Sequence, residues 1–356
     1  MHEAIEIKSF KGTYVLNFTD SLVDYNKIKL DEQVHFLIDK KIADLYSGEL
    51  NKVLDFPNTI LIEAIESNKS IEAVIPVIKN LISNKIRRDH CLIGIGGGII
   101  QDITCFIASI IQRGIQWKFI PTTLLAQADS CIGSKSSINL SNAKNILGTF
   151  NPPDEISLCT RYLSTLDEKE ILSGIGEIIK VHAIKSADAF DRLSADYEEI
   201  LQDDNCLQSY IKQSLLIKKH YIELDEFDKG PRNIFNYGHS FGHAIEAATN
   251  FGIPHGIAVT IGMGLANHLA SELGLLPKEH ERRMAPLINK NSKQYLSYVI
   301  PFDSFLNALM KDKKNTSRKL VVILPLNDDA KICRVELENT EKTRSTMQNY
   351  IKNLSK

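Results

Sequence analysis

Cys91-Leu92-Ile93-Gly94-Ile95-Gly96-Gly97-Gly98 is an apolar run that ends in three consecutive glycines, and a helical pattern carrying Asp102 follows it. The run is typical of a buried strand. Glycine lets the backbone approach a pyrophosphate closely, and the N-terminus of the helix adds partial positive charge. The stretch therefore predicts a nucleotide-binding turn between a strand and a helix. A tight turn without a ligand stays open, because Ile99 stands where the third glycine of the G-x-G-x-x-G motif belongs.

Short apolar runs alternate with amphipathic segments on the N-terminal side of this turn. Residues 34–38 and 59–62 are typical of strands, and helical patterns follow Asp39 and cover residues 70–84. Strands that alternate with helices predict a parallel sheet, and a nucleotide binds at the carboxyl edge of such a sheet. The expected fold class of this part is an α/β nucleotide-binding domain with a parallel sheet.

The pattern changes after Asn151-Pro152-Pro153, where strand-like runs become rare and long helical periodicities dominate. A late strand-like run at 319–324 precedes Pro325, and residues 338–356 indicate a polar helix or a loose end. A chain of 356 residues is long enough for two domains. We expect a Rossmann-like domain over residues 1–155 and a mainly α-helical domain over residues 156–356.

The composition excludes several classes of protein. With 42 Lys and Arg against 44 Asp and Glu, the formal net charge of -2 gives no global attraction to nucleic acid or to an anionic membrane surface. The apolar runs are too short for a membrane span, the N-terminus lacks the pattern of a signal peptide, and the six cysteines form no C-x-x-C pair. We therefore expect a cytoplasmic protein with reduced thiols and with neither a nucleic-acid nor a membrane partner.

Two histidines, His239 and His243, stand four residues apart and share a face if their segment is helical. His255 follows closely, and Glu177 and Glu246 are possible further ligands. Two histidines and a carboxylate with one open position form a common catalytic zinc site. The pattern favours a metal centre over histidines that only pack in a core.

Glu177 and Lys180 stand three residues apart in an apolar segment, so they face the same way on a helix. An exposed ion pair would explain the spacing, but the apolar neighbours favour a buried pair that needs a metal or another partner. Lys135, Lys144 and Asn145 stand beside glycine or other small residues and suit the binding of an anion, with a solvated loop as the alternative.

These segments, in this order, resemble the 3-dehydroquinate synthases and the related sugar phosphate cyclases from about Asp39 to Leu324. The motifs that carry the resemblance are Gly96-Gly97-Gly98-Ile99-Ile100-Gln101-Asp102, Gln112-Arg113-Gly114, Pro121-Thr122-Thr123-Leu124-Leu125-Ala126-Gln127, Gly176-Glu177-Ile178-Ile179-Lys180, Arg232-Asn233-Ile234-Phe235-Asn236-Tyr237-Gly238-His239-Ser240-Phe241-Gly242-His243-Ala244-Ile245-Glu246 and Asp312-Lys313-Lys314.

The resemblance implies an enzyme with NAD bound to its first domain and one divalent metal ion in its second, zinc in the first place and cobalt as an option. It also implies a homodimer and a sugar acid phosphate, DAHP, as the substrate. A secondary alcohol is oxidised with NAD+, phosphate is eliminated, the same nicotinamide reduces the ketone, and an aldol addition closes the ring. The net reaction is that of a carbon-oxygen lyase acting on phosphates, in the shikimate pathway of aromatic amino acid biosynthesis.

The resemblance assigns roles to single residues as well. The metal ligands match Glu177, His239 and His255, whereas His243 matches a substrate-site histidine. The catalytic and substrate-binding positions match Asp129, Lys135, Lys144, Asn145, Lys180, Lys218, Arg232, Asn236, His243, one of Lys313 and Lys314, and Arg113, the last as an arginine that reaches the phosphate across the dimer. The NAD positions match Asp39, Glu66, Lys69, Gly97, Gly98, Ile99, Ile100, Gln101, Asp102, Thr122, Thr123, Tyr162, Leu163, Ser164 and Thr165, with Lys135 and Lys144 beside them.

Some positions depart from the family pattern. Gly133-Ser134-Lys135-Ser136 stands where the family commonly has Gly-Gly-Lys-Thr, and Asp228 stands where many members have glutamate. A cyclase that acts on another substrate, such as sedoheptulose 7-phosphate, is therefore the first alternative. A metal-dependent oxidoreductase of the glycerol dehydrogenase type is the second, and a catalytically silent nucleotide-binding regulator is the third.

Overall fold

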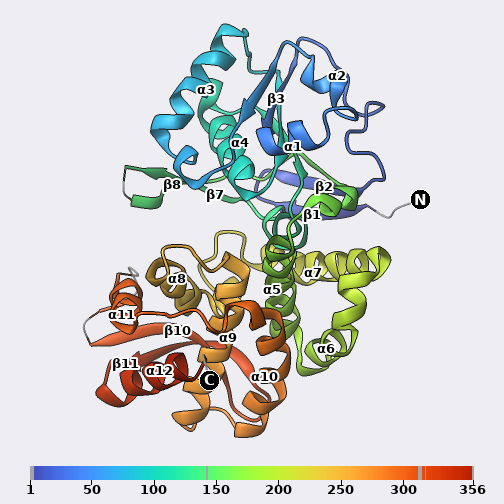
Figure 1. Cartoon of the computed structure of the whole chain (residues 1–356). Coiled ribbons are helices and arrows are strands. Elements are labelled where there is room, and N and C mark those ends of the chain that lie inside the picture. Colours follow the sequence, from blue (N-terminus) through green and yellow to red (C-terminus); the bar gives the residue numbers. More distant parts are fainter. Residues whose placement is uncertain (1–3, 142, 312–314, 317, 355–356) are drawn as a thin grey trace. The chain divides into compact units, whose positions relative to one another are not determined.

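The computed structural model describes residues 4–141, 143–311, 315, 316 and 318–354. The chain folds into two compact units, and Figure 1 labels most of the helices and several strands of both. Unit 1 consists of Met1–Asp167 and Lys218–Asp228, and unit 2 of Glu168–Ile217 and Lys229–Lys356. The assignment of functional domains to residues 1–155 and 156–356 stays a prediction.

Unit 1 is built on a seven-stranded sheet with the strand order β1-β2-β9-β6-β5-β3-β4. The neighbours from β2 to β4 are parallel, and β1 and β2 form an antiparallel pair. This mainly parallel sheet confirms the α/β fold class. The strands are β1 (Ile5–Ser9), β2 (Gly12–Phe18), β3 (Val34–Asp39), β4 (Thr59–Ile62), β5 (Cys91–Gly96), β6 (Gln116–Pro121) and β9 (Glu155–Leu158).

The glycine turn lies where the sequence predicts it. Strand β5 pairs with β3 on one side and with β6 on the other, which explains its apolar run without polar alternation. Gly97 separates β5 from helix α4 (Gly98–Ile110). The helices that precede this turn are α1 (Lys40–Leu45), α2 (Asn51–Leu54) and α3 (Ile71–Ser83). Side-chain caps explain where α1 and α3 begin. The Asp39 side chain accepts a hydrogen bond from the Lys41 N–H, and the Ser70 side chain accepts one from the Ala73 N–H.

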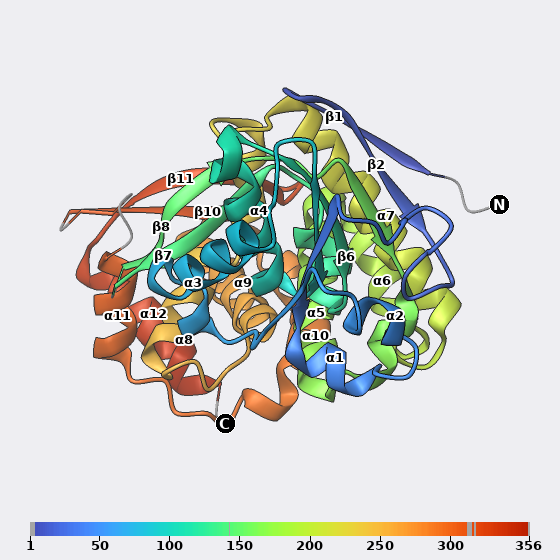
Figure 2. The same cartoon turned by 90° about the horizontal axis from the view of Figure 1, so that it is seen from above.

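A hairpin of β7 (Lys135–Leu140) and β8 (Ala143–Phe150) stands apart from the main sheet and packs against α4. Figure 2 shows the hairpin running alongside α3 and α4. The sequence did not predict these two strands, although the hairpin carries Lys135, Lys144 and Asn145.

Unit 2 is mainly helical, as predicted. Its most buried helix is α9, which packs against α5, α8 and α10. A Cβ added at Gly176 on α5 would lie 2.2 Å from the Gly256 carbonyl oxygen of α9, so only glycine permits this close approach. The helices are α5 (Glu168–Lys185), α6 (Ala187–Gln202), α7 (Asp204–Leu224, with its last turns in unit 1), α8 (His239–Ala248), α9 (His255–Glu272), α10 (Lys278–Ser292), α11 (Phe302–Met310) and α12 (Glu341–Asn353).

A two-stranded antiparallel sheet, β10 (Lys319–Leu326) and β11 (Lys331–Glu338), completes unit 2. The expected strand at 319–324 therefore ended too early, because β10 continues through Pro325, which stands opposite Ile332. Proline is tolerated there because a two-stranded sheet has only edge strands. The tail forms helix α12, so the helical option for residues 338–356 was right.

None of the described helices combines the length and the hydropathy that a bilayer crossing needs. All six cysteines are free, and Cys105, Cys131 and Cys159 are buried.

Candidate active site

The residues expected to bind NAD gather at one edge of the unit 1 sheet. Residues expected to bind NAD stand at or just after the carboxyl ends of five strands, β4, β3, β5, β6 and β9. Because these strands are parallel, their carboxyl ends meet at the same edge. The residues are Glu66 and Lys69 after β4, Asp39 at the end of β3, Gly97–Asp102 after β5, Thr122 and Thr123 after β6, and Tyr162–Thr165 after β9.

The turn after β5 fits a pyrophosphate. The chain passes from β3 to β4 on one side and then to β5 on the other, which makes β3 and β5 the topological switch point of the sheet. Gly97 stands at the N-cap of α4 without a capping side chain, and a Cβ there would come within 2.9 Å of Thr123 Cγ2. The bare N-terminus of a 13-residue helix at a switch point is suited to binding an anion.

A buried lysine connects the NAD positions to the β7–β8 hairpin. Lys69 Nζ lies 3.0 Å from Asp102 Oδ2 and donates to Asn145 Oδ1 at 2.8 Å. Asn139 holds the same hairpin, because it accepts from the Asn145 N–H at 2.8 Å and donates to Glu66 Oε1 at 2.9 Å. No local sequence signal indicates Asn139, because its contact with Glu66 joins residues far apart in the chain.

Two further lysines of unit 1 face carboxylates. Lys218 Nζ lies 3.0 Å from Asp129 Oδ1 and is buried, although its helix α7 begins in unit 2. Lys135 pairs with Asp228, the residue that departs from the family pattern. The structure therefore brings two expected substrate positions together, Asp129 and Lys218, and gives Lys135 a partner that the sequence analysis did not assign.

Glu177 and Lys180 form a buried ion pair on α5, as the apolar neighbours predict. Their side chains are 1% and 2% exposed. Glu177 Oε2 pairs with Lys180 Nζ, and Oε1 has no hydrogen-bond partner among the described residues. Burial opposes ionisation, yet the charges of Lys180 and His239 hold the pKa of Glu177 well below its usual range. Glu177 is therefore an anion, and its Oε1 atom is available to a metal ion.

His239 and His255 point their Nε2 atoms at this carboxylate. The Nε2–Oε1 distances to Glu177 are 3.6 Å for His239 and 3.5 Å for His255. Ligands about 2.1 Å from a tetrahedral metal ion stand about 3.4 Å from one another. The other ring nitrogen of each histidine is occupied, because His239 Nδ1 lies 3.3 Å from the Tyr237 carbonyl and His255 Nδ1 lies 3.1 Å from Glu246 Oε2. These three residues fit a divalent metal ion.

The structure gives Glu246 a different position from the one considered in the sequence. Glu246 was a possible ligand, but its carboxylate lies on the Nδ1 side of His255, away from Glu177. Such a carboxylate orients a ligating histidine. Burial opposes protonation of His255, but the carboxylates of Glu177 and Glu246 raise its pKa to about 10. A metal ion that binds His255 must therefore displace a proton.

His243 lies beside the two other histidines, as its spacing on α8 predicts. Ligand atoms of His239, His243 and His255 all lie within 4.8 Å of one another, and His243 is the exposed member of the group. Its ring centroid is 5.4 Å from that of His239 and 5.5 Å from that of His255. Among the described residues, these three histidines form the one cluster of this kind. An exposed histidine at its rim can face a substrate.

The structure also places Arg232, Asn236 and Lys144, whereas two predicted residues fall outside the part of the chain that it describes. Arg232 is buried and Asn236 half-buried in the 3-10 turn Pro231–Asn236 of unit 2. Lys144 Nζ lies 4.0 Å from Glu66 Oε1. Lys313 and Lys314 lie outside the described residues.

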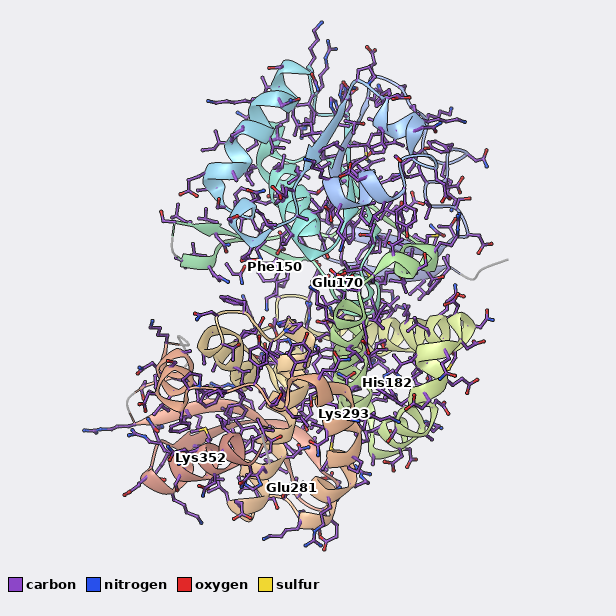
Figure 3. The ribbon with its side chains drawn as sticks, viewed as in Figure 1. Phe150, Glu170, His182, Glu281, Lys293 and Lys352 are labelled. Carbon is purple, nitrogen blue, oxygen red and sulfur yellow. The ribbon has the colours of Figure 1, made fainter. Side chains whose placement is uncertain are left out.

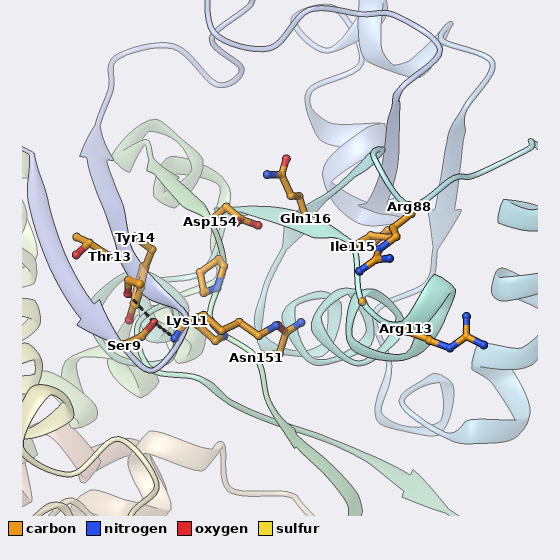
Figure 4. Close-up of a pocket in the computed structure, with 14 residues that line it drawn as sticks. Ser9, Lys11, Thr13, Tyr14, Arg88, Arg113, Ile115, Gln116, Asn151 and Asp154 are labelled. Carbon is orange, nitrogen blue, oxygen red and sulfur yellow. Dashed lines mark hydrogen bonds between the residues drawn. The ribbon is translucent and has the colours of Figure 1, made fainter.

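Arg113 lies at the end of α4 opposite the glycine turn. A helix of 13 residues is about 20 Å long, so Arg113 stands far from the NAD positions of its own chain. Arg113 lines a pocket of about 330 Å³ in unit 1, together with Lys11 and Arg88. Figure 4 shows its guanidinium pointing away from Lys11. Its backbone has a φ of 67°, a left-handed conformation that is uncommon for arginine.

Sequence comparison assigns the chain to a family. The profile of the 3-dehydroquinate synthase N-terminal domain matches residues 59–173, and that of the C-terminal domain matches residues 174–315. The 3-dehydroquinate synthase of Dictyoglomus turgidum is 39% identical over 299 residues, which are 83% of this chain and 82% of that protein. The chain belongs to the 3-dehydroquinate synthase family.

Solved structures share the fold of this 3-dehydroquinate synthase family member. A 2-deoxy-scyllo-inosose synthase complexed with carbaglucose-6-phosphate, NAD+ and Co2+ superposes with a TM-score of 0.83 at 21% identity, covering 98% of this chain and all of the other. A 2-epi-5-epi-valiolone synthase from Streptomyces hygroscopicus with bound NAD+ and Zn2+ gives a TM-score of 0.81 at 24% identity, over 96% of each chain. At these identities the likeness shows the fold alone.

Proposed function

We propose that this protein catalyses the 3-dehydroquinate synthase reaction, which converts DAHP to 3-dehydroquinate and phosphate. The observation that carries the proposal is the arrangement around Glu177, where two Nε2 atoms stand 3.5 and 3.6 Å from one buried carboxylate oxygen beside Lys180. The identity of 39% to a 3-dehydroquinate synthase supports the choice of reaction. The enzyme is then a carbon-oxygen lyase, because the hydride taken from the substrate returns to it later.

Two groups that the fold family binds belong to the proposal. The strand ends and the α4 N-terminus of unit 1 would hold NAD, and Glu177, His239 and His255 of unit 2 would hold the metal ion. When bound, NAD accepts and returns a hydride, and the metal ion acts as a Lewis acid that lowers the pKa of a coordinated hydroxyl. We propose zinc as the metal, because two histidines and a carboxylate with an open position suit it.

The chain's own residues supply positioning and charge. Lys180 and the buried Arg232 offer cationic donors in unit 2, and Lys135, Lys144 and Lys218 do so in unit 1. A substrate with a carboxylate and a phosphate needs such donors, and arginine binds either group in a bidentate manner. His243 and Asn236 are proposed to bind the substrate's hydroxyl groups. We propose that the phosphate leaves with its own oxygen as the base, so that no side chain is needed as the base for that step.

Further properties complete the proposal. The distance of Arg113 from the NAD positions of its own chain supports the role expected from the sequence, in which Arg113 serves a partner copy in a homodimer. A cytoplasmic location and a place in the shikimate pathway of aromatic amino acid biosynthesis remain the expectation from the sequence.

The test is an assay of the purified protein with DAHP, NAD+ and zinc. Release of phosphate together with 3-dehydroquinate, without net formation of NADH, is the expected result. Phosphate release from sedoheptulose 7-phosphate but not from DAHP would replace the proposal by the cyclase alternative. Stoichiometric NADH with glycerol would identify a dehydrogenase instead. A protein that binds no divalent ion and releases no phosphate from either sugar would be a catalytically silent regulator.

A further inference from the structure

A groove of about 720 Å³ lies in unit 2 between α5, α6 and α7. Its floor consists of buried side chains, and charged and polar side chains surround it. Figure 3 labels His182 of the floor, which stands two residues after Lys180 on α5. The floor residues are His182, Ala189 and Tyr210, and the surrounding residues are Arg192, Asp196, Glu199, Asp203, Asn205, Cys206, Ser209 and Gln213.

His182 brings an unused hydrogen-bond acceptor to this floor. Its Nδ1 lies 2.8 Å from the Ile178 carbonyl oxygen of its own helix. Because a carbonyl only accepts, Nδ1 carries the proton and Nε2 has the lone pair. The Nε2 atom has no hydrogen-bond partner among the described residues, and the side chain, which lines the groove, is 1% exposed. A buried acceptor without a donor is costly, so the site favours a ligand that donates.

The other side of the groove is also rich in acceptors. Asp196 accepts a hydrogen bond from the Tyr210 hydroxyl at 2.6 Å, which consumes the hydroxyl proton and leaves the second carboxylate oxygen for another donor. The Tyr210 and His182 ring centroids are 5.2 Å apart, so both acceptors lie close to the same aromatic side chain. Three carboxylates, those of Asp196, Glu199 and Asp203, surround the groove together with a single guanidinium, that of Arg192.

We propose that this groove binds a small organic cation with primary ammonium groups, of the chemical class of a diamine. One ammonium donates to His182 Nε2 and to the Asp196 carboxylate, and the aromatic face of Tyr210 adds a cation–π contact. The second ammonium lies among the outer carboxylates of Glu199 and Asp203. The groove is independent of the proposed reaction, because none of its lining residues is among the expected metal, NAD or substrate positions.

Titration calorimetry of the full-length protein, loaded with NAD+ and zinc, tests this proposal with 1,4-diaminobutane as the probe. Saturable binding with one site per chain is the expected result. Asp196→Asn should weaken that binding at least tenfold. His182→Phe keeps the aromatic ring but removes the acceptor, so it should also weaken binding and provides a second variant if Asp196→Asn does not fold.

The matched control is Glu198→Gln on the same helix. Glu198 is exposed and pairs with Lys290 outside the groove. Its substitution removes the same charge as Asp196→Asn, so the variant should bind the probe like the parent protein. An equal loss in Glu198→Gln would overturn the proposal, since it would indicate diffuse charge attraction. Absence of saturable binding at millimolar probe would overturn it as well. Equal binding of neutral 1,4-butanediol would contradict the choice of a cation.

Discussion

Glu246 and His255 meet on the side of the imidazole ring that faces away from Glu177. Glu246 Oε2 lies 3.1 Å from His255 Nδ1, while His255 Nε2 lies 3.5 Å from Glu177 Oε1. The ring is therefore held by one carboxylate through one nitrogen, and its other nitrogen is directed at the second carboxylate. This is the arrangement by which a carboxylate fixes the orientation of a ligating histidine.

Glu246→Ala should weaken zinc binding about 10- to 100-fold, because His255 loses the group that orients its ring. Competition with a chromogenic chelator measures the zinc Kd. Glu281→Ala is the matched control, since Glu281 Oε1 contacts His268 Nδ1 at 2.8 Å in the same manner, outside the histidine cluster. Equal affinities in the parent protein and in Glu246→Ala would contradict the assigned role.

Glu177→Gln should remove the bound metal ion and leave NAD binding intact. The expected ligands all belong to unit 2, whereas the NAD positions all belong to unit 1. Elemental analysis gives the metal content, and titration calorimetry gives the NAD affinity. Loss of NAD binding with the metal retained would show that the two sets of residues are assigned to the wrong groups.

Lys180→Met should reduce turnover about 100-fold, the usual effect of removing a charged donor from a catalytic site. The Tm of the metal-loaded protein should change by less than about 3 °C, because the metal ion neutralises Glu177 in place of the lysine. Lys290→Met, which breaks the exposed pair with Glu198, is the control and should change neither quantity. If Lys180→Met lowered the Tm sharply in the loaded protein, the pair would be structural.

The sequence predicted the elements whose signals are local. The apolar run before Gly96, the helix after Ser70 and the shared face of His239 and His243 each depend on residues a few positions apart. It did not predict β9, whose four residues follow two prolines and are recognisable as a strand only through parallel pairing with β2 and β6. Pairing with strands far away in the chain leaves no local periodicity.

The same distinction applies to the site. The spacing of Glu177 and Lys180 and the apolar residues around them were enough to predict a buried pair, which the structure confirms. The partnership of Glu246 with His255 spans nine residues and crosses from α8 to α9, so no helical spacing indicates it. The residues expected to bind a ligand were therefore easier to predict from the sequence than the residues that hold their side chains in position.

Gly176→Ala should destabilise the protein by about 2–3 kcal/mol. The new methyl group would lie 2.2 Å from the Gly256 carbonyl oxygen, so α5 and α9 would have to move apart. The metal content should fall with it, since Glu177 and His255 are direct neighbours of these glycines. Gly48→Ala is the control, because nothing lies within 4 Å of the position of its new methyl group. The free energy of unfolding of this variant should differ from that of the parent protein by about 0.5 kcal/mol or less. Chemical denaturation with elemental analysis checks both outcomes.

A buried histidine pair in unit 1 should make the protein less stable below pH 6.5. His35 Nε2 lies 3.0 Å from His90 Nδ1, and burial, followed by the charge of His90, lowers the pKa of His35 from 6.5 to about 4. Between these values the unfolded chain binds a proton that the folded chain does not, so stability is present above pH 6.5 and is lost as the pH falls towards 4. The loss between pH 7 and pH 5 should be about 2 kcal/mol, or about 3 °C in Tm. Thermal unfolding of the metal-free protein at the two pH values measures the loss. His35→Gln should show a smaller drop in Tm between pH 7 and pH 5. The exposed control His220→Gln should show the same drop in Tm as the parent protein. A drop in His35→Gln as large as that of the parent would assign the acid sensitivity to other groups.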